Sequence, residues 1–476
     1  MTLTAERPPV AAEVGLTAAL ADRVAALRFE DLPEKVVILA RQCLLDWLGV
    51  SIGARREPLV EILLASALEE AGPPQAALIG RRERLAVSQA ALINGAMGHA
   101  LDYDDVNSFG HPTAPVAPAA LALGEKLGAS GAEVITAFVA GYETETRVSR
   151  FMGPSHYDRG WHATSTFGAF GAAAAAARLM DLAPQQVGHA FGLAGTQAAG
   201  LKSMFGTMAK PLHPGLAAVA GLRAADLAGR GFTSNPDVLE TAQGFGATQS
   251  ERTNTAAALA EPGGGFHILA NLFKYHAACY LTHSTIEAMR ALRLEGLRGE
   301  DVAAIRLEVA PTHLKVCDIA GPRTGLEVKF SIRFLAALAL LGADTSDEGL
   351  YTDATAARAD AARLAAVATV VPTASGTLAN VEVDTCDGRT LRASRDVGVP
   401  ETDLASQQAR LEAKFARLTS GAIDPAAAVG ACMSLPEAPD LRRLLAAVIP
   451  GSPALLLHRK AEEGGHEGAA RVVEGG

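Results

Sequence analysis

The hydrophobic positions along most of the chain recur with the spacing of helices. From about residue 14 to 270, apolar residues return every three to four positions, as on the buried face of a helix. Pro33 stands in the first turn of one such segment, where its missing N–H would have had no partner. Residues 167–180 (FGAFGAAAAAARLM) carry almost no bulk or charge and predict a buried helix that other helices approach closely. Breaks rich in glycine and proline separate the helices, at residues 72–74, 153–154, 229–231 and 262–265.

The pattern changes after about residue 271. Residues 304–309 (AIRLEV) alternate apolar and polar side chains, which is typical of a half-buried strand. Residues 378–397 predict a β-hairpin, because Asp387-Gly388 stands between alternating segments and both positions tolerate a positive φ. Helical segments are expected on either side of these strands, near residues 284–294, 331–341, 403–418 and 440–448.

These patterns predict a mainly α protein with two domains. At 476 residues the chain exceeds the size of one ordinary core. We expect a large all-helical domain built from both chain ends, residues 1–271 and 403–458, with a smaller α+β domain inserted at residues 272–402. Residues 459–476 are polar and rich in glycine and glutamate, which predicts a disordered tail.

Composition and charge narrow the class of protein. The formal net charge is −10, so the broad basic surface that binds nucleic acid is not expected, although a local cationic pocket can still bind an anion. The five cysteines are scattered without a CxxC pair, which indicates a reducing compartment and argues against an iron–sulfur cluster. The N-terminus lacks a signal-peptide core, and runs of small apolar residues such as 171–177 are far shorter than the ~20 residues that span a bilayer. We therefore predict a cytoplasmic protein that binds neither nucleic acid nor membranes.

Four polar groups could carry chemistry, and the first surrounds residues 99–113. Asp102 and Tyr103 precede two further carboxylates, Asp104 and Asp105, which fit a solvated, capped helix end equally well. Their spacing lacks the DxDxDG loop of a calcium site. His111 lies in a loop between a glycine and a proline, a position that favours acid–base chemistry over core packing.

The second and third groups precede helices made of small residues. His162 and Thr164 lead into the alanine-rich segment, where the free N–H groups of a helix start would favour a bound anion. The alternative is that Trp161 anchors the packing and its neighbours only cap the helix. Lys210 is expected where another helix begins, and a positive charge is unfavourable there unless an anion lies beside it. The alternative is an ordinary surface lysine.

The fourth group lies at the expected junction of the two domains. Ser284 and Glu287 match a capping box, so His283 is expected just before a helix with its ring facing a cleft. The alternative is a histidine that only packs at the helix start. Cys279 fits a small buried hydrophobe. The sequence has no GxSxG, P-loop, HExxH or strand-flanked GxGxxG motif, which argues against serine hydrolase, kinase and dinucleotide chemistry.

Taken in order, these groups resemble the MmgE/PrpD family, which includes 2-methylcitrate dehydratase, cis-aconitate decarboxylase and iminodisuccinate epimerase. The resemblance extends from about residue 10 to 455. The order and spacing of the matching segments, taken together, make it more specific than any single segment would. The matching segments are NGAMGHALDYDD, GHPTAPVAPAALALGE, GWHATSTFGAFGAAAAAARL, MAKPLHPGLAA, KYHAACYLTHSTIEA and GLEVKFSI.

The resemblance implies a helical domain with an α+β lid, a homodimer, and catalysis without a metal or cofactor. It implies a pocket between the helical domain and the lid that binds a small polycarboxylate substrate. It places the catalytic residues at Asp102, His111, Lys210 and His283. Substrate contacts are expected from His162, Thr164, Lys274 and Tyr103.

The implied reaction removes a proton next to a carboxylate of the substrate. We assign His111 and His283 as the acid–base pair, Lys210 as the clamp for the carboxylate and Asp102 as the orienting partner. A 2-methylcitrate dehydratase-like hydro-lyase is the expected activity, and an epimerase or racemase of a dicarboxylate such as iminodisuccinate is the alternative. Val106, where several members have threonine, and the lack of a lid tyrosine at residues 315–318 argue against cis-aconitate decarboxylation. The alternative to an enzyme is a structural dimer without catalytic activity.

Overall fold

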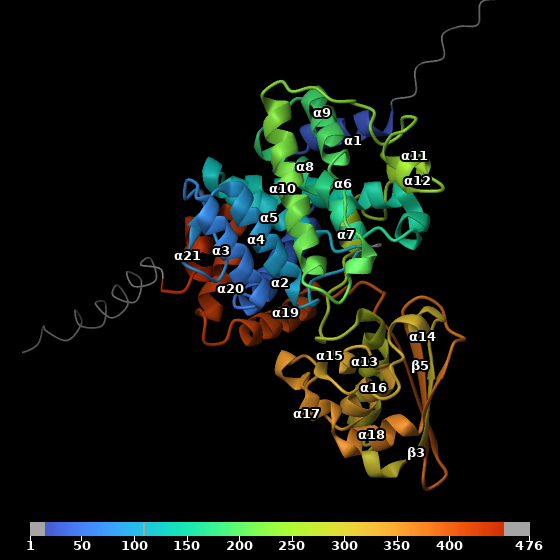
Figure 1. The fold of residues 1–476 in the computed structure, drawn as a ribbon. Helices are drawn as coiled ribbons and strands as arrows, with labels where there is room; N and C mark the ends of the chain where they lie inside the picture. Colours follow the sequence, from blue (N-terminus) through green and yellow to red (C-terminus); the bar gives the residue numbers. More distant parts are fainter. Residues whose placement is uncertain (1–14, 108–109, 452–476) are drawn as a thin grey trace, which may run out of the picture.

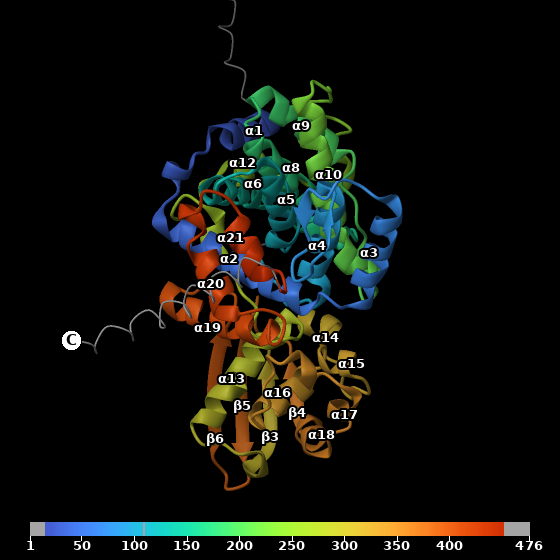
Figure 2. The same cartoon turned by 90° about the vertical axis from the view of Figure 1, so that its left-hand side faces the viewer.

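Two separate cores organise the molecule. The computed structural model describes residues 15–107 and 110–451, and the tail predicted at 459–476 lies outside them. The larger core unites apolar side chains from residues 16–273 with others from residues 411–448. The smaller core is drawn from residues 277–383, with Val50 and Tyr103 added from the N-terminal half. Figures 1 and 2 show the corresponding two bodies, one with blue, green and red helices and one with yellow and orange elements.

Helices dominate the described residues, which confirms the mainly α fold class. The first part of the chain supplies α1 (Leu16–Ala26), α2 (Glu34–Gly53), α3 (Pro58–Glu70), α4 (Val87–Ala100), α5 (Thr113–Leu127), α6 (Gly131–Asp158), α7 (Ala163–Thr166), α8 (Gly168–Leu179), α9 (Pro184–Gly195), α10 (Ala209–Gly229), α11 (Phe245–Gln249) and α12 (Thr255–Leu259). A two-stranded antiparallel ribbon joins α3 to α4, formed by β1 (Ala76–Ala77) and β2 (Arg84–Leu85). The last part returns to the same body with α19 (Leu404–Leu418), α20 (Pro425–Met433) and α21 (Arg442–Val448).

The second body combines helices with a four-stranded sheet in the order β4-β3-β5-β6. Its elements are α13 (His283–Leu294), β3 (Val302–Glu308), α14 (Thr312–Val316), α15 (Gly325–Val328), α16 (Ile332–Leu340), α17 (Asp353–Ala356), α18 (Ala359–Ala366), β4 (Ala368–Val371), β5 (Leu378–Thr385) and β6 (Thr390–Asp396). Strand β3 runs parallel to β4 and antiparallel to β5. The predicted hairpin is confirmed, since β5 and β6 pair antiparallel around Gly388, whose φ is +86°.

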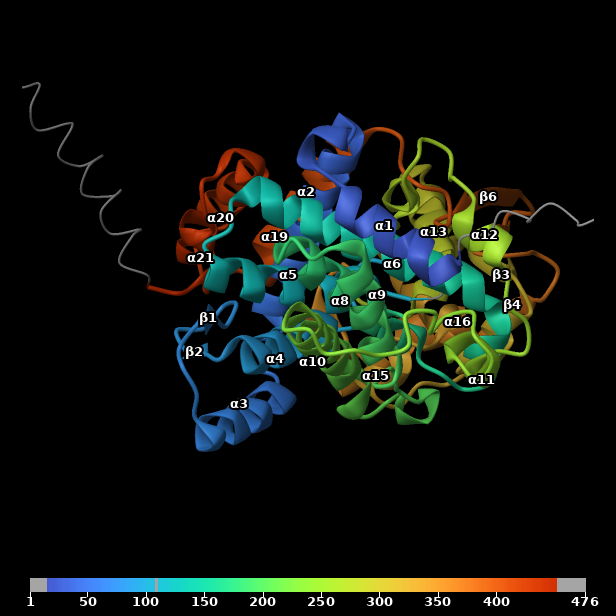
Figure 3. The same cartoon turned by 90° about the horizontal axis from the view of Figure 1, so that it is seen from above.

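Helix α8 is the alanine-rich helix expected from the sequence, and it lies among α5, α6, α9 and α10 (Figure 3). Its small side chains let neighbouring backbones come close. A Cβ added at Gly141 of α6 would lie 2.6 Å from the Gly171 carbonyl oxygen, and one at Gly221 of α10 would lie 2.4 Å from the Ala173 nitrogen. These contacts leave no room for larger residues, because protein interiors are packed to crystal-like density.

Helix α2 is the one helix in the described residues that is long and apolar enough to cross a membrane. Within the fold, 78% of its apolar window is buried, and it packs against α4 and α19. A core helix of this kind passes the same test of length and composition, so the helix is weak evidence for a membrane span.

The break predicted at residues 153–154 is confirmed as a kink, at which two helical segments that together form α6 meet. Gly153 has a φ of +62°, which departs from the helix, and Pro154 follows it. A proline removes a backbone donor and clashes with the preceding turn, so the helix bends at this point. The turns that follow carry the chain to His162 at the start of α7.

Candidate active site

Asp102 lies between two lysines at the end of α4. Its carboxylate Oδ1 accepts hydrogen bonds from Lys210 Nζ at 2.8 Å and from Lys274 Nζ at 3.1 Å. Lys274 Nζ also donates to the Asp102 carbonyl oxygen at 2.7 Å. Asp102 has a φ of +52°, in the left-handed region that aspartate enters more readily than most residues. These contacts hold a strained backbone position, as is common at functional sites.

This arrangement explains why a lysine is tolerated at the start of α10. Lys210 is the second residue of that helix, and the anion that its position demands is the Asp102 carboxylate. Burial alone would raise the pKa of the Asp102 carboxyl, but Lys210 and Lys274 outweigh it and hold the pKa well below its usual value. Burial would likewise lower the pKa of Lys210, and Asp102 raises it instead. Both groups are therefore charged at neutral pH.

His111 shares a buried carboxylate with a second histidine. Asp104 Oδ2 lies 2.9 Å from His99 Nδ1 and 3.1 Å from His111 Nδ1. The two imidazole rings meet edge to face with their centroids 4.7 Å apart. The His111 side chain is 15% exposed while its Nδ1 atom and the Asp104 side chain are buried, so the solvent-accessible part of the ring lies away from Nδ1. A carboxylate behind an imidazole fixes its tautomer and orientation, which is the arrangement of a general acid or base.

Two more histidines extend the cluster. The Nδ1 atoms of His162 and His213 lie 2.9 Å apart, so one ring donates a hydrogen bond to the other. The His162 ring stacks 5.7 Å from that of His99. Thr164 connects this part to the loop before α5, because its Oγ1 accepts a hydrogen bond from the His111 backbone N–H at 3.2 Å. The predicted residues His111, His162, Thr164 and Lys210 thus belong to one cluster with Asp102.

The cluster is electrostatically asymmetric. The pKa of His99 is lowered to about 4, by burial first and by Lys210 as well, while Asp104 opposes both. Burial lowers the pKa of His162 and of His213, with Lys210 contributing in each case. For Asp104, burial would raise the pKa, but His111 and His99 hold it well below its usual value. The site therefore places the ionised Asp104 carboxylate and the positive charge of Lys210 beside three neutral imidazoles, those of His99, His162 and His213.

His283 contacts residues outside this cluster. It is the first residue of α13, and its Nε2 lies 3.2 Å from the Ala278 carbonyl oxygen. Its ring packs against those of His276 and Tyr280, with centroids 4.9 and 5.2 Å away. No hydrogen bond or ring contact among the described residues joins it to His111. Burial lowers its pKa well below the usual value, with help from His276 and Lys274. Its role as the second acid–base residue stays a prediction.

The capping box predicted for α13 is wrong. The helix cap lies two residues earlier, at Thr282, and no side chain there makes a capping hydrogen bond. The Ser284 hydroxyl instead accepts a hydrogen bond from the Val397 N–H, from the end of the inserted sheet. Glu287 instead bonds to His276 Nε2 at 3.1 Å and to Arg410 at 3.0 Å. Both side chains serve long-range contacts that local spacing could not reveal.

The Tyr103 side chain also points to contacts outside the cluster. Its hydroxyl donates to the Ser346 carbonyl oxygen at 3.3 Å, and Lys414 Nζ lies 3.9 Å from its ring centroid. Its substrate-binding role stays a prediction. Lys274, in contrast, is in direct contact with Asp102, as described above.

Sequence reasoning missed three members of the cluster, His99, Asp104 and His213. Asp104 had been read equally well as a solvated cap, yet it is fully buried. A signal was available: burying a carboxylate requires partners, and His99 stands five residues before it. His213 lies one helical turn after Lys210, a spacing that places both on the same face of α10.

Three residues of the cluster have the side chains and the spacing of metal ligands. His99, Asp104 and His111 each offer one ligand atom, and these atoms lie within 4.8 Å of one another. Two imidazoles with a carboxylate form a donor set that several transition metals accept. However, Asp104 Oδ2 already contacts both rings, and Lys210 places a positive charge beside the same group. The residues therefore fit a hydrogen-bonded acid–base cluster better than a cation site.

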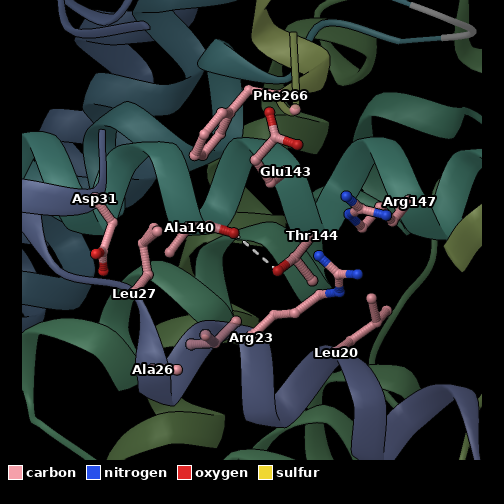
Figure 4. A pocket seen from close by; sticks show the side chains of 12 residues that line it. Leu20, Arg23, Ala26, Leu27, Asp31, Ala140, Glu143, Thr144, Arg147 and Phe266 are labelled. Atoms are coloured by element: carbon pink, nitrogen blue, oxygen red, sulfur yellow. Dashed lines mark hydrogen bonds between the residues drawn. The ribbon is translucent and has the colours of Figure 1, made fainter. Parts of the chain in front are cut away.

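A separate cavity of about 260 Å³ lies between α1 and α6 (Figure 4). Its walls are mostly apolar, and Figure 4 shows Arg23 and Arg147 at one side of it. Both arginines pair with Glu261, and Arg147 also donates to the Ala258 and Ala260 carbonyl oxygens. These contacts tie α12 to α1 and α6, so we assign the arginines a structural role.

The comparison with known proteins identifies the family. Residues 18–257 match the MmgE/PrpD N-terminal domain, and residues 276–431 match the MmgE/PrpD C-terminal domain. The chain belongs to the MmgE/PrpD family.

Curated relatives carry the name of one lyase of this family. Cis-aconitate decarboxylase of Aspergillus terreus (strain NIH 2624 / FGSC A1156) is 30% identical over 298 residues, which cover 59% of this chain and 61% of that protein. Cis-aconitate decarboxylase-like protein oryM of Aspergillus oryzae (strain ATCC 42149 / RIB 40) is 30% identical over 312 residues, 62% of this chain and 64% of that protein. Cis-aconitate decarboxylase of Homo sapiens is 29% identical over 239 residues, 49% and 50% of the two chains. The matched part thus spans less than two thirds of each relative.

Proposed function

We propose that this protein is a lyase that transfers a proton next to a carboxylate of a small polycarboxylic acid. One observation carries the proposal: the Lys210 ammonium group and the Asp104–His111 pair belong to the same cluster, in which the side chains of Lys210 and His111 are partly exposed. A carbon next to a carboxylate is hard to deprotonate because negative charge develops on the carboxylate oxygens. A fixed cation that receives this charge lowers the barrier, and a positioned imidazole moves the proton.

In this proposal Lys210 clamps the substrate carboxylate. Its side chain is 19% exposed and its ammonium group donates a hydrogen bond to Asp102. Because an ammonium group has three donors, it can still bind a ligand. Lys274 is 3% exposed and donates twice to Asp102. We therefore assign Lys274 to positioning Asp102, and Asp102 to positioning Lys210.

His111 transfers the proton in this proposal. Asp104 holds its Nδ1 edge, which leaves Nε2 as the atom that faces a substrate. In a dehydration, the base takes a proton from the carbon next to the carboxylate, the C–O bond on the neighbouring carbon breaks, and an acid protonates the departing hydroxide to water. The products are an alkene and water. A 2-methylcitrate-type hydroxy acid is the substrate class that this reaction requires.

Decarboxylation is the second candidate, and the names of the relatives favour it. In that reaction the bond from carbon to a carboxylate breaks, CO2 leaves, and the acid delivers a proton to the remaining carbon. Epimerisation is the third outcome of the same residue set, in which the proton returns to the opposite face. The three outcomes differ in what leaves the substrate, which makes them experimentally separable.

The test is incubation of the purified full chain in deuterated water with 2-methylcitrate, citrate, cis-aconitate and iminodisuccinate, followed by NMR. Water loss, CO2 loss and label incorporation distinguish the three outcomes. We expect His111→Gln and Lys210→Met each to lower turnover by about 10²–10⁴-fold, the usual contribution of a positioned acid–base group. Lys126→Met is the matched control, because Lys126 is exposed on α5. Full activity of His111→Gln would overturn the assignment, and a wild-type chain inert toward the whole panel would favour an inactive structural dimer.

A further inference from the structure

A second charged cleft lies at the junction of the two bodies. Its cavity measures about 690 Å³. One wall is the face of α19 that carries Arg410, Lys414 and Arg417, and the facing wall is α13 with the residues after α16. Figure 2 shows α19 directly above α13 and α16 at this junction. The cleft thus borders both bodies, while the His111 cluster is absent from its lining.

The cleft is basic although the chain as a whole is acidic. Five cationic side chains line it, three from α19 together with Arg290 and Arg293 from α13. The lining carboxylates are Glu287 and Asp344, which pair with Arg410 and Arg417, and Asp46 pairs with Lys414 from behind. Two positive charges therefore remain in excess, contributed by Arg290 and Arg293. In a protein of net charge −10, a local excess of positive charge favours the binding of an anion at that place.

The two unpaired arginines differ in how they are held. Arg293 donates to the Leu340 carbonyl oxygen at 3.0 Å, and its guanidinium group lies against Gly342. A Cβ at Gly342 would come within 2.6 Å of Arg293 Cζ, and the glycine has a φ of +79°. Arg290 is exposed and has no carboxylate within ion-pair distance among residues 15–107 and 110–451. One arginine is thus fixed in the wall and the other is free to close over a ligand.

We propose that this cleft is a binding site for a small polyanion, of the polyphosphate or polycarboxylate class, that bridges α13 of the second body to α19 of the first. Guanidinium groups bind phosphate and carboxylate oxygens in pairs, which gives such a site both strength and orientation. A cavity of this size holds a ligand of several charged groups. A bound polyanion would neutralise the excess charge and hold the two bodies together.

The site borders the candidate active site through the backbone. Lys414, in the wall of the cleft, donates to the carbonyl oxygens of Tyr103 and Lys274. These residues flank or contact Asp102. The proposal does not rest on the proposed lyase function, because it needs only the binding of an anion.

Isothermal titration calorimetry of the full chain with inorganic tripolyphosphate, and separately with citrate, tests the proposal. We expect one site per chain at low salt, and a rise in melting temperature with ligand. Arg290→Glu places a negative charge in the cleft and should weaken binding on the order of tenfold or more. Arg223→Glu is the matched control, since it makes the same charge change at an exposed position of α10 outside the cleft. Arg290→Gln is the milder second variant.

The outcomes separate the alternatives. Weakened tripolyphosphate binding in both Arg290 variants, with Arg223→Glu unchanged, supports a polyphosphate site, and the same pattern with citrate supports a polycarboxylate site. If Lys210→Met abolishes citrate binding and Arg290→Glu leaves it intact, citrate binds at the candidate active site. That result would overturn the assignment of the cleft as a polycarboxylate site. Equal affinity of Arg290→Glu and Arg223→Glu for tripolyphosphate, or no binding of either anion, overturns the proposal.

Discussion

Lys414 ties together three segments that are far apart in the sequence. Its ammonium group lies 2.6 Å from Asp46 Oδ1 of α2 and donates to the carbonyl oxygens of Tyr103 at 2.7 Å and Lys274 at 3.0 Å. Burial raises the pKa of Asp46 to about 6, although Lys414 opposes this. Burial lowers the pKa of Lys414, although Asp46 opposes that in turn. Each of the two buried charges is therefore stabilised by the other.

Lys414→Met should destabilise the protein by about 3–5 kcal/mol, because it leaves Asp46 buried without a cation. Adding Asp46→Leu should recover part of the loss, since the second change removes the unpaired charge. The two carbonyl oxygens that Lys414 satisfied remain unpaired in both variants, so recovery is incomplete. Urea unfolding of the wild type, both single variants and the double variant gives the four free energies. A Lys414→Met variant as stable as the wild type would contradict this account.

At the scale of elements, glycines on two faces of α4 let the neighbouring helices α2 and α10 approach it closely. A Cβ at Gly98 would lie 1.9 Å from Trp47 Nε1 of α2. A Cβ at Gly95 would lie 2.7 Å from the Gly215 Cα of α10. Helix α4 ends just before Asp102 and α10 begins just before Lys210, so this close packing sets the distance between the two charged groups.

Gly95→Ala should destabilise the protein by about 1–3 kcal/mol, because the added methyl group meets backbone that cannot yield without separating α4 from α10. The control is Gly430→Ala in α20, where no atom lies within 4 Å of an added Cβ. Alanine is the better helix former, so Gly430→Ala should be neutral or stabilising by up to about 1 kcal/mol. Thermal and urea unfolding measure both. Equal effects of the two substitutions would show that the α4–α10 contact relaxes freely.

At the scale of the whole molecule, buried titratable groups make stability depend on pH. Burial lowers the pKa of eight histidines: His99, His156, His162, His213, His267, His276, His283 and His313. Burial raises the pKa of five carboxyl groups: Asp46, Asp105, Glu143, Glu145 and Glu348. The two sets act in opposite directions, and the histidines are the more numerous.

The melting temperature should therefore fall as the pH is lowered from 6.5 to 5.5, the range in which an unfolded histidine becomes mostly protonated. An unfolded histidine takes up a proton below a pKa of about 6.5, whereas the buried ones do not, so the unfolded chain binds more protons and gains stability as the pH falls. The buried carboxyl groups bind protons in the folded state over the same range and reduce the effect without reversing it. Differential scanning calorimetry across this range is the measurement. A melting temperature that rises on acidification would contradict the assignment of neutral buried histidines.

The sequence by itself determined the elements and the residue types of the site. The spacing of apolar residues and the positions of glycine were sufficient to predict the alanine-rich helix and the hairpin around Gly388. Both could be predicted because helix and strand periodicity are local properties of the chain. The order of the polar motifs identified the MmgE/PrpD family, and Asp102, His111 and Lys210 were named from it. Lys210 was also marked by an electrostatic conflict at a helix start, which is again a local signal.

Only the tertiary structure decided which side chains meet. It brought Lys210 to Asp102 across 108 residues, buried Asp104 behind His111, and placed the His283 ring against His276 and Tyr280. It also gave Ser284 and Glu287 partners outside the helix whose start their spacing had suggested. The physical reason is that burial and ion pairing depend on long-range packing, which a local pattern does not encode. Sequence spacing proposed the members of the site, and the packing of α4 against α10 fixed the contacts among them.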